Sequence, residues 1–541
     1  MPSVTEIRRQ ERSVLWHDSP SPDKVGTKRA RKMSSRGEKR TAIPIFLILL
    51  SCYAYFFPRW ADWNQNSRLN LVMAIVDQGA LYIDDYYNGY TATGDYAEYG
   101  GHIYSTKAPG TAFLGVPVYW IFQEVAGGAA ARWALGLLRA NEAIEDTLTA
   151  GGSGLLPTKV HAALALYTVT FFIVALPSAL LGVILYWFAG RLTPARLPRV
   201  WAVLVYGLTT SAFPYAGALY GHQIVAVLLF VAFYLAFLIG QERLRPSLTF
   251  GVGLILGHAV ITEYPAAPVA GAILLYLFYR LQWKRWIGPA ILGGALPGLL
   301  WMGYNYAIFH KPIAFGYRHA PLWQDVNRAG FFSLTYPQVE ALWGITFGSF
   351  RGLFFLSPVL LLALPGFCRL AREKTMRPEF LVCLWAGLSF LLLVGSSVMW
   401  QGGYAVGPRY LIPMLPFLVL PLTLFAAKWG KKRWARVLIV TLTTWSLVAA
   451  WAETIGGQQF PDYTLNPLFQ YSKPRLLAGD IARNLGTAVG LTGWVSLAPL
   501  LAVVGSCLWV LNKQLAASRS RSTAATQLAS RAERILTHEE R

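Results

Sequence analysis

The sequence predicts an all-α protein that crosses a membrane many times, and three observations support this class. Of 541 residues, 55% are hydrophobic and only 14% are charged, whereas about a quarter of a soluble domain is charged. Apolar runs of roughly 18 residues or more recur from Ile43 onwards, each long enough to cross the hydrocarbon layer as a helix. These runs are uninterrupted, which excludes the alternating pattern of a membrane β-barrel.

The first 41 residues are predicted to form a disordered cytoplasmic tail, because they are rich in serine, lysine and arginine and have no apolar period. The chain carries a net charge of +21. Its basic residues lie before the first apolar run and in short loops, so we interpret them as an orientation signal and a contact with anionic lipid. No nucleic-acid partner is expected. The first run lacks a small-residue cleavage site and is typical of an uncleaved signal anchor.

A transmembrane domain is expected over residues 42–511, followed by a cytoplasmic tail over 512–541. The first span, 42–57, ends at Pro58. Eleven more spans are expected at 160–189, 200–213, 223–240, 247–261, 265–280, 287–308, 352–368, 380–400, 410–427, 437–453 and 491–511. The segment 109–122 is short and contains Pro117, so we expect it to lie at the interface or re-enter the membrane. This choice places 17 basic residues of five short loops, and both termini, in the cytoplasm.

The first extracytoplasmic loop, residues 59–159, gathers acidic residues and one lysine between apolar segments. Residues 69–76 are amphipathic enough to lie on the membrane surface. The loop passes through Tyr104-Ser105-Thr106-Lys107-Ala108-Pro109-Gly110 straight into the apolar segment. We predict that it forms the floor of an active site, the alternative being a solvated connector. Polar turns at 213–223, 262–265, 305–351, 400–410 and 454–490 are expected on the same side.

Two basic residues are the main candidates for binding a phosphate. Lys107 is placed at the membrane surface, and the following Pro109-Gly110 gives a tight turn suited to an anion; a lysine that only snorkels is the alternative. Arg409, in Gly407-Pro408-Arg409-Tyr410, can bind a phosphate through two parallel hydrogen bonds or contact a lipid headgroup. Arg351 is a weaker third candidate.

Several acidic residues are candidates for orienting or deprotonating a hydroxyl group. Asp84 and Asp85 are adjacent, and repulsion between their charges can favour the protonated form of one of them, which suits proton transfer. The alternative is that the two aspartates only form a turn before Tyr86. Asp95 lies in a turn-like segment. His222 and Glu263 stand at span ends, where ionisable residues indicate function or a hydrogen-bonded structural pair.

No cofactor or metal site is predicted. The four cysteines lie in or beside apolar runs without metal-ligand spacing. No phosphate-binding loop of a nucleotide-driven pump and no zinc-protease motif is present.

The first outer loop and its ending resemble the multi-span glycosyltransferases of the GT-C fold, the class with protein O-mannosyltransferases and the aminoarabinose transferase of lipid A. Arg68 and Lys107-Ala108-Pro109 fit the family's arginine-containing helix and lysine turn. The later motifs are similar to a bacterial branch described as mannosyltransferase-like or RgtA/B/C/D-like. They are Tyr304-Asn305-Tyr306, Gly316-Tyr317, Arg351-Gly352-Leu353-Phe354, Ser357-Pro358 and Gly407-Pro408-Arg409-Tyr410. The resemblance covers most of residues 42–510.

The resemblance implies a polyprenyl-phosphate sugar donor, transfer with inversion, and an extracytoplasmic acceptor that is a glycan, lipid or protein. It implies an active site on the outer face of a bacterial inner membrane, with Lys107 and Arg409 holding the donor phosphate and Arg68 and Tyr104 supporting them. One departure is that relatives have an acidic pair shortly before the arginine, where this chain has Gln65-Asn66-Ser67. The base therefore stays open among Asp62, Asp84, Asp85 and Asp95.

Two other functions fit the same pattern. A secondary transporter also suits twelve spans with both ends inside, but such proteins usually show two related halves and a site at mid-membrane depth, whereas the acids of this chain gather on one face. A polymerase or ligase acting on a lipid-linked glycan would share the outer site.

Overall fold

The computed structural model describes residues 24–57, 62–125, 127–148, 152, 154–457 and 464–539, and most of them are helical. Pro58, which was expected to end the first span, lies outside the described residues. The chain divides into two compact units, one formed by Ile45–Trp509 and one by Met1–Pro44 with Val510–Arg541.

Seven helical segments in the described residues are long and apolar enough to cross a membrane. They are Pro157–Ala189, Gly221–Gly240, Lys284–Phe309, Lys374–Gly395, Arg409–Trp429, Arg433–Gly456 and Gly493–Ser518. The chain is thus a multi-pass, mainly α-helical membrane protein, as expected.

The expected number of twelve spans is not confirmed, because the other five fall in shorter or composite elements. They correspond to part of α2 (Lys24–Tyr55), to α9 (Arg196–Leu208), α12 (Thr249–Thr262) and α13 (Ala267–Arg280), and to α17 (Leu353–Leu356) with α18 (Ala363–Arg372). Prolines explain some of the interruptions. Pro265 precedes α13 and Pro358 separates α17 from α18, and proline removes a helical hydrogen bond and clashes with the preceding turn.

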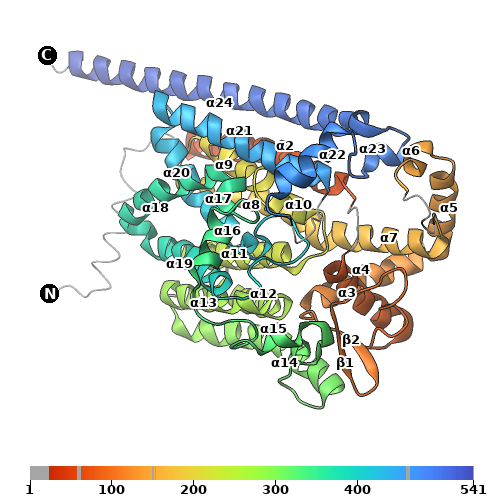
Figure 1. Cartoon of the computed structure of the whole chain (residues 1–541). Coiled ribbons are helices and arrows are strands. Elements are labelled where there is room, and N and C mark those ends of the chain that lie inside the picture. Colours follow the sequence, from red (N-terminus) through yellow and green to blue (C-terminus); the bar gives the residue numbers. More distant parts are fainter. Residues whose placement is uncertain are drawn as a thin grey trace. The chain divides into compact units, whose positions relative to one another are not determined.

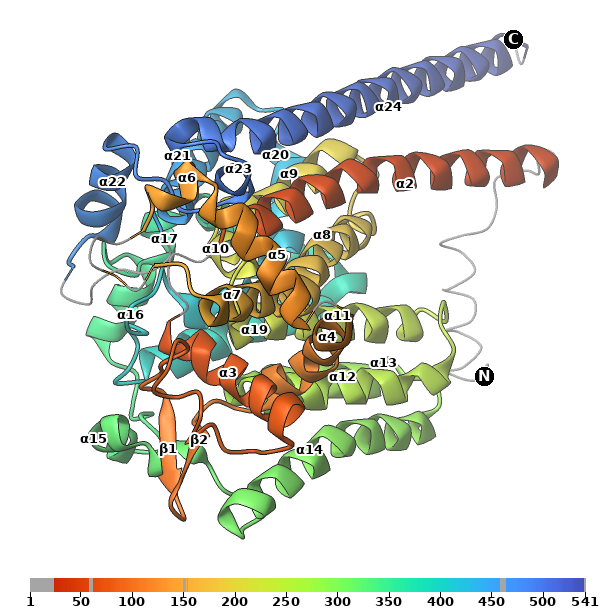
Figure 2. The ribbon, with the colours of Figure 1, turned by 90° about the vertical axis from the view of Figure 1, so that its right-hand side faces the viewer.

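Figures 1 and 2 show how the remaining helices of the larger unit are arranged. They are α7 (Pro157–Thr170), α8 (Leu176–Ala189), α10 (Ala212–Ala216), α11 (Gly221–Gly240), α14 (Ile287–Phe309), α15 (Gln324–Arg328), α16 (Val339–Thr346), α19 (Arg377–Gly395), α20 (Val419–Trp429), α21 (Arg433–Gly456), α22 (Lys473–Leu477) and α23 (Leu485–Ala488).

Helix α11 is one of the most buried helices of the larger unit, since most of its residues from Gly221 to Ile239 are buried. Phe230 and Phe233 are completely buried and contact the rings of Phe188 and Phe417 from two neighbouring segments. Aromatic burial of this kind contributes most of the packing energy of a core.

Helices α12 and α14 lie side by side in both views of the ribbon (Figures 1 and 2) because small residues line their contact. A Cβ added at Gly257 would lie 2.5 Å from the carbonyl oxygen of Gly294. Such close backbone approach is typical of membrane helices with glycine at the interface.

The first outer loop folds into α3 (Trp63–Met73), a two-stranded hairpin and α4 (Gly110–Val125), followed by α5 (Gly127–Arg139) and α6 (Glu142–Glu145). Strands β1 (Tyr96–Tyr99) and β2 (His102–Ser105) are antiparallel, with Tyr96 opposite Ser105. Gly100 and Gly101 both have positive φ, as a tight two-residue hairpin turn requires. The expectation that residues 69–76 lie on a surface is wrong, since residues 64–73 of α3 are all buried.

The smaller unit contains the first part of α2 and most of α24 (Ala498–Glu539). Helix α2 begins at Lys24, so the structure gives a helix to residues 24–40, where the composition predicts disorder. Lysine and arginine, which are frequent there, are strong helix formers. The end of α24 likewise extends the helix expected at 491–511 into the predicted tail.

Candidate functional site

The site begins at Asp62, which is the N-cap of α3. Its Oδ1 accepts a hydrogen bond of 2.9 Å from the backbone N–H of Gln65, as aspartate at this position typically does. Its Oδ2 accepts a hydrogen bond from the hydroxyl of Tyr220, just before α11. The Gln65 side chain also reaches this region, since its Oε1 accepts from the backbone N–H of Leu219 at 2.9 Å. These hydrogen bonds connect the start of α3 to the residues just before α11.

The buried polar side chains of α3 hold the next part of the loop. Asn66 and Asn70 donate to the carbonyl oxygens of Ala92 and Thr91, each at 2.9 Å. The Ser67 hydroxyl lies 2.6 Å from the carbonyl oxygen of Asp95 and 2.7 Å from the Ser105 hydroxyl. Buried polar groups need such partners, so these bonds fix the two segments that carry Asp95 and Lys107.

Lys107 and Asp95 form a partly buried ion pair. Their Nζ and Oδ2 atoms are 2.7 Å apart, and only 13% and 12% of the two side chains are exposed. The turn after Lys107 is fixed by close packing, because a Cβ at Gly110 would lie 2.5 Å from Thr262 Oγ1 and 2.7 Å from its backbone nitrogen. The lysine is therefore held next to the end of α12, where Glu263 follows.

Arg68 and Glu263 form a second ion pair in the same place. Arg68 Nη2 lies 2.6 Å from Glu263 Oε1, with side-chain exposures of 3% and 14%. Arg68 Nη1 donates to the Asn64 side chain, and His222 Nδ1 lies 3.7 Å from the same Glu263 oxygen. Burial and the charge of Glu263 raise the pKa of the Tyr317 hydroxyl well above its ordinary value, so Tyr317 stays neutral beside this pair.

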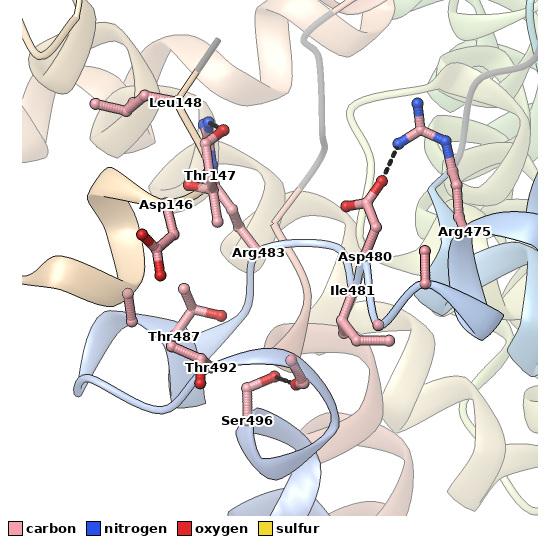
Figure 3. A pocket seen from close by; sticks show the side chains of 14 residues that line it. Asp146, Thr147, Leu148, Arg475, Asp480, Ile481, Arg483, Thr487, Thr492 and Ser496 are labelled. Carbon is pink, nitrogen blue, oxygen red and sulfur yellow. Dashed lines mark hydrogen bonds and ion pairs between the residues drawn. The ribbon is translucent and has the colours of Figure 1, made fainter. Parts of the chain in front are cut away.

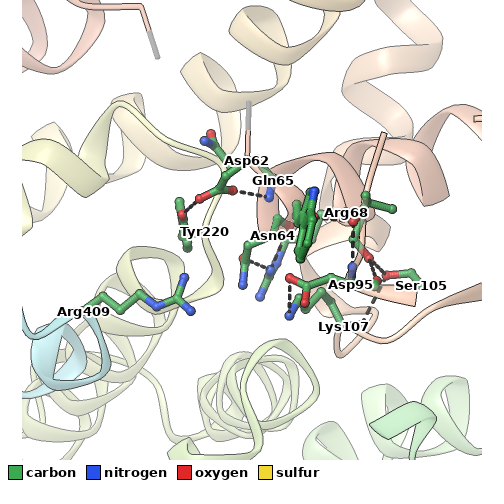
Figure 4. A network of polar contacts seen from close by, with 12 residues as sticks. Asp62, Asn64, Gln65, Arg68, Asp95, Ser105, Lys107, Tyr220 and Arg409 are labelled. Carbon is green, nitrogen blue, oxygen red and sulfur yellow. Dashed lines mark hydrogen bonds and ion pairs between the residues drawn. The ribbon is translucent and has the colours of Figure 1, made fainter. Parts of the chain in front are cut away.

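Arg409 approaches the cluster from another part of the chain, and its side chain points toward Asn64, Arg68, Asp95 and Lys107 (Figure 4). Its guanidinium lies 5.2 Å from the ring centre of Tyr220 and 5.0 Å from that of Tyr410. Its Nη2 donates to the Tyr410 hydroxyl at 3.3 Å, and its buried Nε has no hydrogen-bond partner. Within the described residues, no carboxylate lies within ion-pair distance of Arg409.

Arg351 is completely buried behind this site. Its Nε and Nη2 donate to the carbonyl oxygens of Gln401 and Gly403 at 2.9 and 2.6 Å. Burial lowers the pKa of Arg351 to about 10. Arg351 thus stabilises the glycine turn that precedes Arg409. This geometry does not favour the direct phosphate contact that was predicted for Arg351.

The other predicted site residues make contacts elsewhere in the loop. Asp84 Oδ2 lies 2.6 Å from His102 Nδ1 and Oδ1 accepts from the Ile103 N–H at 2.7 Å. Asp85 accepts from the exposed Gln78 side chain at 2.8 Å. Tyr104 is buried, with its ring centre 6.3 Å from that of Phe309. None of these contacts involves Lys107 or Arg409.

Asn64 and Tyr220 were not singled out as site residues by the sequence, although they contact the charged residues. Tyr220 lies in a polar turn that was expected on the outer side. That expected position was the one feature of the sequence that pointed to Tyr220 as a site residue. Its pairing with Asp62 spans 158 residues, so no local pattern could reveal it.

The described residues contain no group of three or more histidine, cysteine or acidic side chains arranged to hold a metal ion. The arrangement instead joins three cations, three carboxylates and several tyrosine hydroxyls at the ends of α3, α11 and α12. Such a site can bind a phosphate and move a proton.

No known family matches the sequence, and no curated protein is significantly similar to it. Among solved structures, the chain is similar to ArnT from Cupriavidus metallidurans, whose crystal structure is bound to undecaprenyl phosphate. The TM-score is 0.44 and the identity 12%, over 88% of this chain and 75% of ArnT. Similarity this low does not establish a common function, so the chain's own residues have to indicate what it does.

Proposed function

We propose that the chain is a glycosyltransferase that moves a sugar from a polyprenyl-phosphate donor to an acceptor hydroxyl on the extracytoplasmic face, with inversion. The observation that carries this proposal is the convergence of Arg409, Lys107 and Arg68 opposite Asp62 (Figure 4). Phosphate-binding cations and a carboxylate base are the two parts that such a transfer requires.

Arg409 is the strongest candidate for the donor phosphate. Lys107 and Arg68 each have a carboxylate within 2.7 Å, whereas Arg409 has neighbouring aromatic rings and an unpartnered Nε. A guanidinium has five N–H donors and matches phosphate oxygens in pairs. Lys107 has three N–H donors, so it can share them between Asp95 and a phosphate.

Asp62 is the base that the geometry favours. The carboxylate of Asp95 is neutralised by Lys107, and that of Asp84 is held by His102 and Ile103. Asp62 accepts from the Gln65 N–H and from the Tyr220 hydroxyl, and it adjoins the Tyr220 ring on which Arg409 lies. This places a carboxylate beside the arginine that is proposed to bind the donor phosphate.

In the proposed reaction the acceptor oxygen attacks the anomeric carbon while its proton passes to Asp62. The bond between that carbon and the donor phosphate oxygen breaks on the opposite face. Arg409 and Lys107 stabilise the negative charge that develops on the leaving lipid phosphate. Donors fixed before the reaction are effective because they do not reorganise during it.

A secondary transporter is not favoured, since this polar cluster lies at helix ends. A polymerase or ligase of lipid-linked glycans would use the same residues, and it differs only in the length of the donor glycan.

The test is sugar transfer from short-chain polyprenyl-phosphate donors by the purified protein in lipid nanodiscs. We expect Asp62→Asn to lower the rate by about 10²–10⁴-fold, the usual contribution of a general base. Arg409→Met should also remove most of the activity. Glu98→Gln, which changes an exposed acid of the same loop, should leave the rate within about twofold of the unchanged protein.

The outcome also identifies the base. Full activity of Asp62→Asn with loss in Asp84→Asn, Asp85→Asn or Asp95→Asn would transfer the role to that residue. A folded protein that turns over no donor would contradict the proposal, and turnover of long glycan donors only would favour the polymerase or ligase.

A further inference from the structure

A second polar region lies in a cavity of about 510 Å³ between the end of α6 and the segment from α22 to the start of α24 (Figure 3). A volume in this range is typical of sites for small ligands. None of the residues of the phosphate site lines it.

Hydroxyl groups and one acid dominate the lining. The hydroxyls belong to Thr147, Thr487, Thr492 and Ser496. Asp146 is exposed, and its carboxylate lies among them (Figure 3). Hydroxyls donate and accept, and a carboxylate accepts from two neighbouring donors, so this lining matches a ligand that carries many hydroxyl groups.

The two arginines of the cavity already have partners. Arg475 Nη1 lies 2.6 Å from Asp480 Oδ2. Arg483 donates to the Thr147 hydroxyl at 2.8 Å and to its carbonyl oxygen at 2.7 Å. With two acids and two arginines, the lining carries no net charge. A free phosphate or a lipid phosphate would therefore be a poor fit, and a neutral ligand fits better.

The cavity has a rigid frame. The Phe57 N–H donates to the Arg483 carbonyl oxygen at 2.8 Å, and the Tyr55 hydroxyl donates to the Ser496 carbonyl oxygen at 2.5 Å. Asn141 donates to the Thr487 carbonyl oxygen at 3.0 Å. A site formed in advance loses little entropy when a ligand binds.

The same frame connects the cavity to the proposed base. Asp62 follows Phe57 by five residues, and five residues span at most about 18 Å. Because the Phe57 N–H is hydrogen-bonded to the Arg483 carbonyl oxygen of the cavity wall, this bound on chain length limits how far Asp62 can lie from that wall.

We propose that this cavity binds the carbohydrate part of the acceptor, a short, neutral, hydroxyl-rich glycan, and positions its terminal hydroxyl toward Asp62. The role as acceptor site rests on the proposed transferase function. Binding of carbohydrate does not depend on it.

The experiment measures binding to the full-length protein in nanodiscs by calorimetry. The probes are four neutral trisaccharides, α-mannotriose, maltotriose, cellotriose and chitotriose, with inorganic phosphate as the comparison. We expect at least one trisaccharide to bind, and Asp146→Asn and Thr492→Val each to raise its Kd at least tenfold. Asp325→Asn, an exposed acid on α15, is the control and should leave the Kd unchanged.

Absence of binding by all four sugars, or an unchanged Kd in both cavity variants, would overturn the proposal. So would phosphate binding that Asp146→Asn strengthens, since that would make the cavity an anion site.

Failure of the two proposals can be told apart. If a trisaccharide binds and both variants weaken it, but no donor is turned over, the carbohydrate site stands and the transferase function fails. If transfer occurs with unchanged KM for the acceptor in Asp146→Asn and Thr492→Val, the transferase stands and the cavity has no part in it.

Discussion

At the scale of single residues, the site is built from charges that are paired before any substrate binds. Arg68 and Lys107 are held by Glu263 and Asp95, with less than 15% of each side chain exposed. Ion pairs in such surroundings fix position more than they add stability. Arg409 lies against two tyrosine rings, and in the part of the chain that the structure describes no carboxylate is within ion-pair distance of it.

Glu263→Gln should destabilise the protein by about 3–5 kcal/mol, because it leaves the buried charge of Arg68 without its counter-charge. Thermal unfolding in lipid nanodiscs measures the effect. Replacing the partner as well, in Arg68→Met/Glu263→Gln, should recover a large part of the loss, since no unpaired charge remains. Glu340→Gln, at an exposed position of α16, is the control, and an equal effect of both glutamine variants would contradict this account.

At the scale of elements, α3 shows why the pattern of apolar residues was misleading. Its sequence W-N-Q-N-S-R-L-N-L-V-M has a polar first half and a mainly apolar second half, and residues 69–76 were expected to lie on the membrane surface. The structure buries both faces, because Ser67, Asn66 and Asn70 find backbone partners in the segment 91–95. Hydropathy measures transfer from water and does not include such hydrogen bonds.

Gly110→Ala should lower both stability and transfer activity. Its new Cβ would lie 2.7 Å from the backbone nitrogen of Thr262, so α4 would have to move away from α12 and shift the lysine turn beside it. Overpacking of this kind typically costs about 1–3 kcal/mol.

The matched control for this change is Gly136→Ala in α5, where an added Cβ meets no atom within 4 Å. It should be neutral or slightly stabilising, since alanine favours the helix by about 0.5–1 kcal/mol. The measurements are the unfolding temperature and the transfer rate of both variants. Equal behaviour would mean that the contact of α4 with α12 does not position Lys107.

At the scale of the whole chain, hydropathy predicts the class correctly, and it locates the seven longest spans. It does not separate true spans from the segments that proline interrupts, which is why the count of twelve is not confirmed. The sequence singled out Asp62, Lys107, Arg409 and Glu263 one by one as candidates, and their roles stay predictions. Their grouping was not predictable, because the pair of Arg68 and Glu263 joins residues 195 positions apart.

In the larger unit the two ends of α11 have different neighbours, and the orientation in the membrane stays a prediction. Helix α11 starts at Gly221 in the site and ends at Gly240, where an added Cβ would lie 2.7 Å from Arg280. Its 20 residues extend about 30 Å, the thickness of the hydrocarbon layer. Arg280 in turn contacts the Thr375 carbonyl oxygen at 3.2 Å, so two of the basic loops meet at the end away from the site.

This orientation can be tested by cysteine labelling of intact cells with a membrane-impermeant maleimide, in a Cys368→Ser/Cys507→Ser background. Tyr336→Cys, at a residue that is 72% exposed in the loop 305–351, should be labelled in intact cells. Lys431→Cys, exposed in a basic loop, should be labelled only after permeabilisation, because positive residues are retained in the cytoplasm. The reverse result would place Asp62 and Arg409 on the cytoplasmic side, where an extracytoplasmic acceptor cannot reach them, even if the protein transferred sugar in nanodiscs.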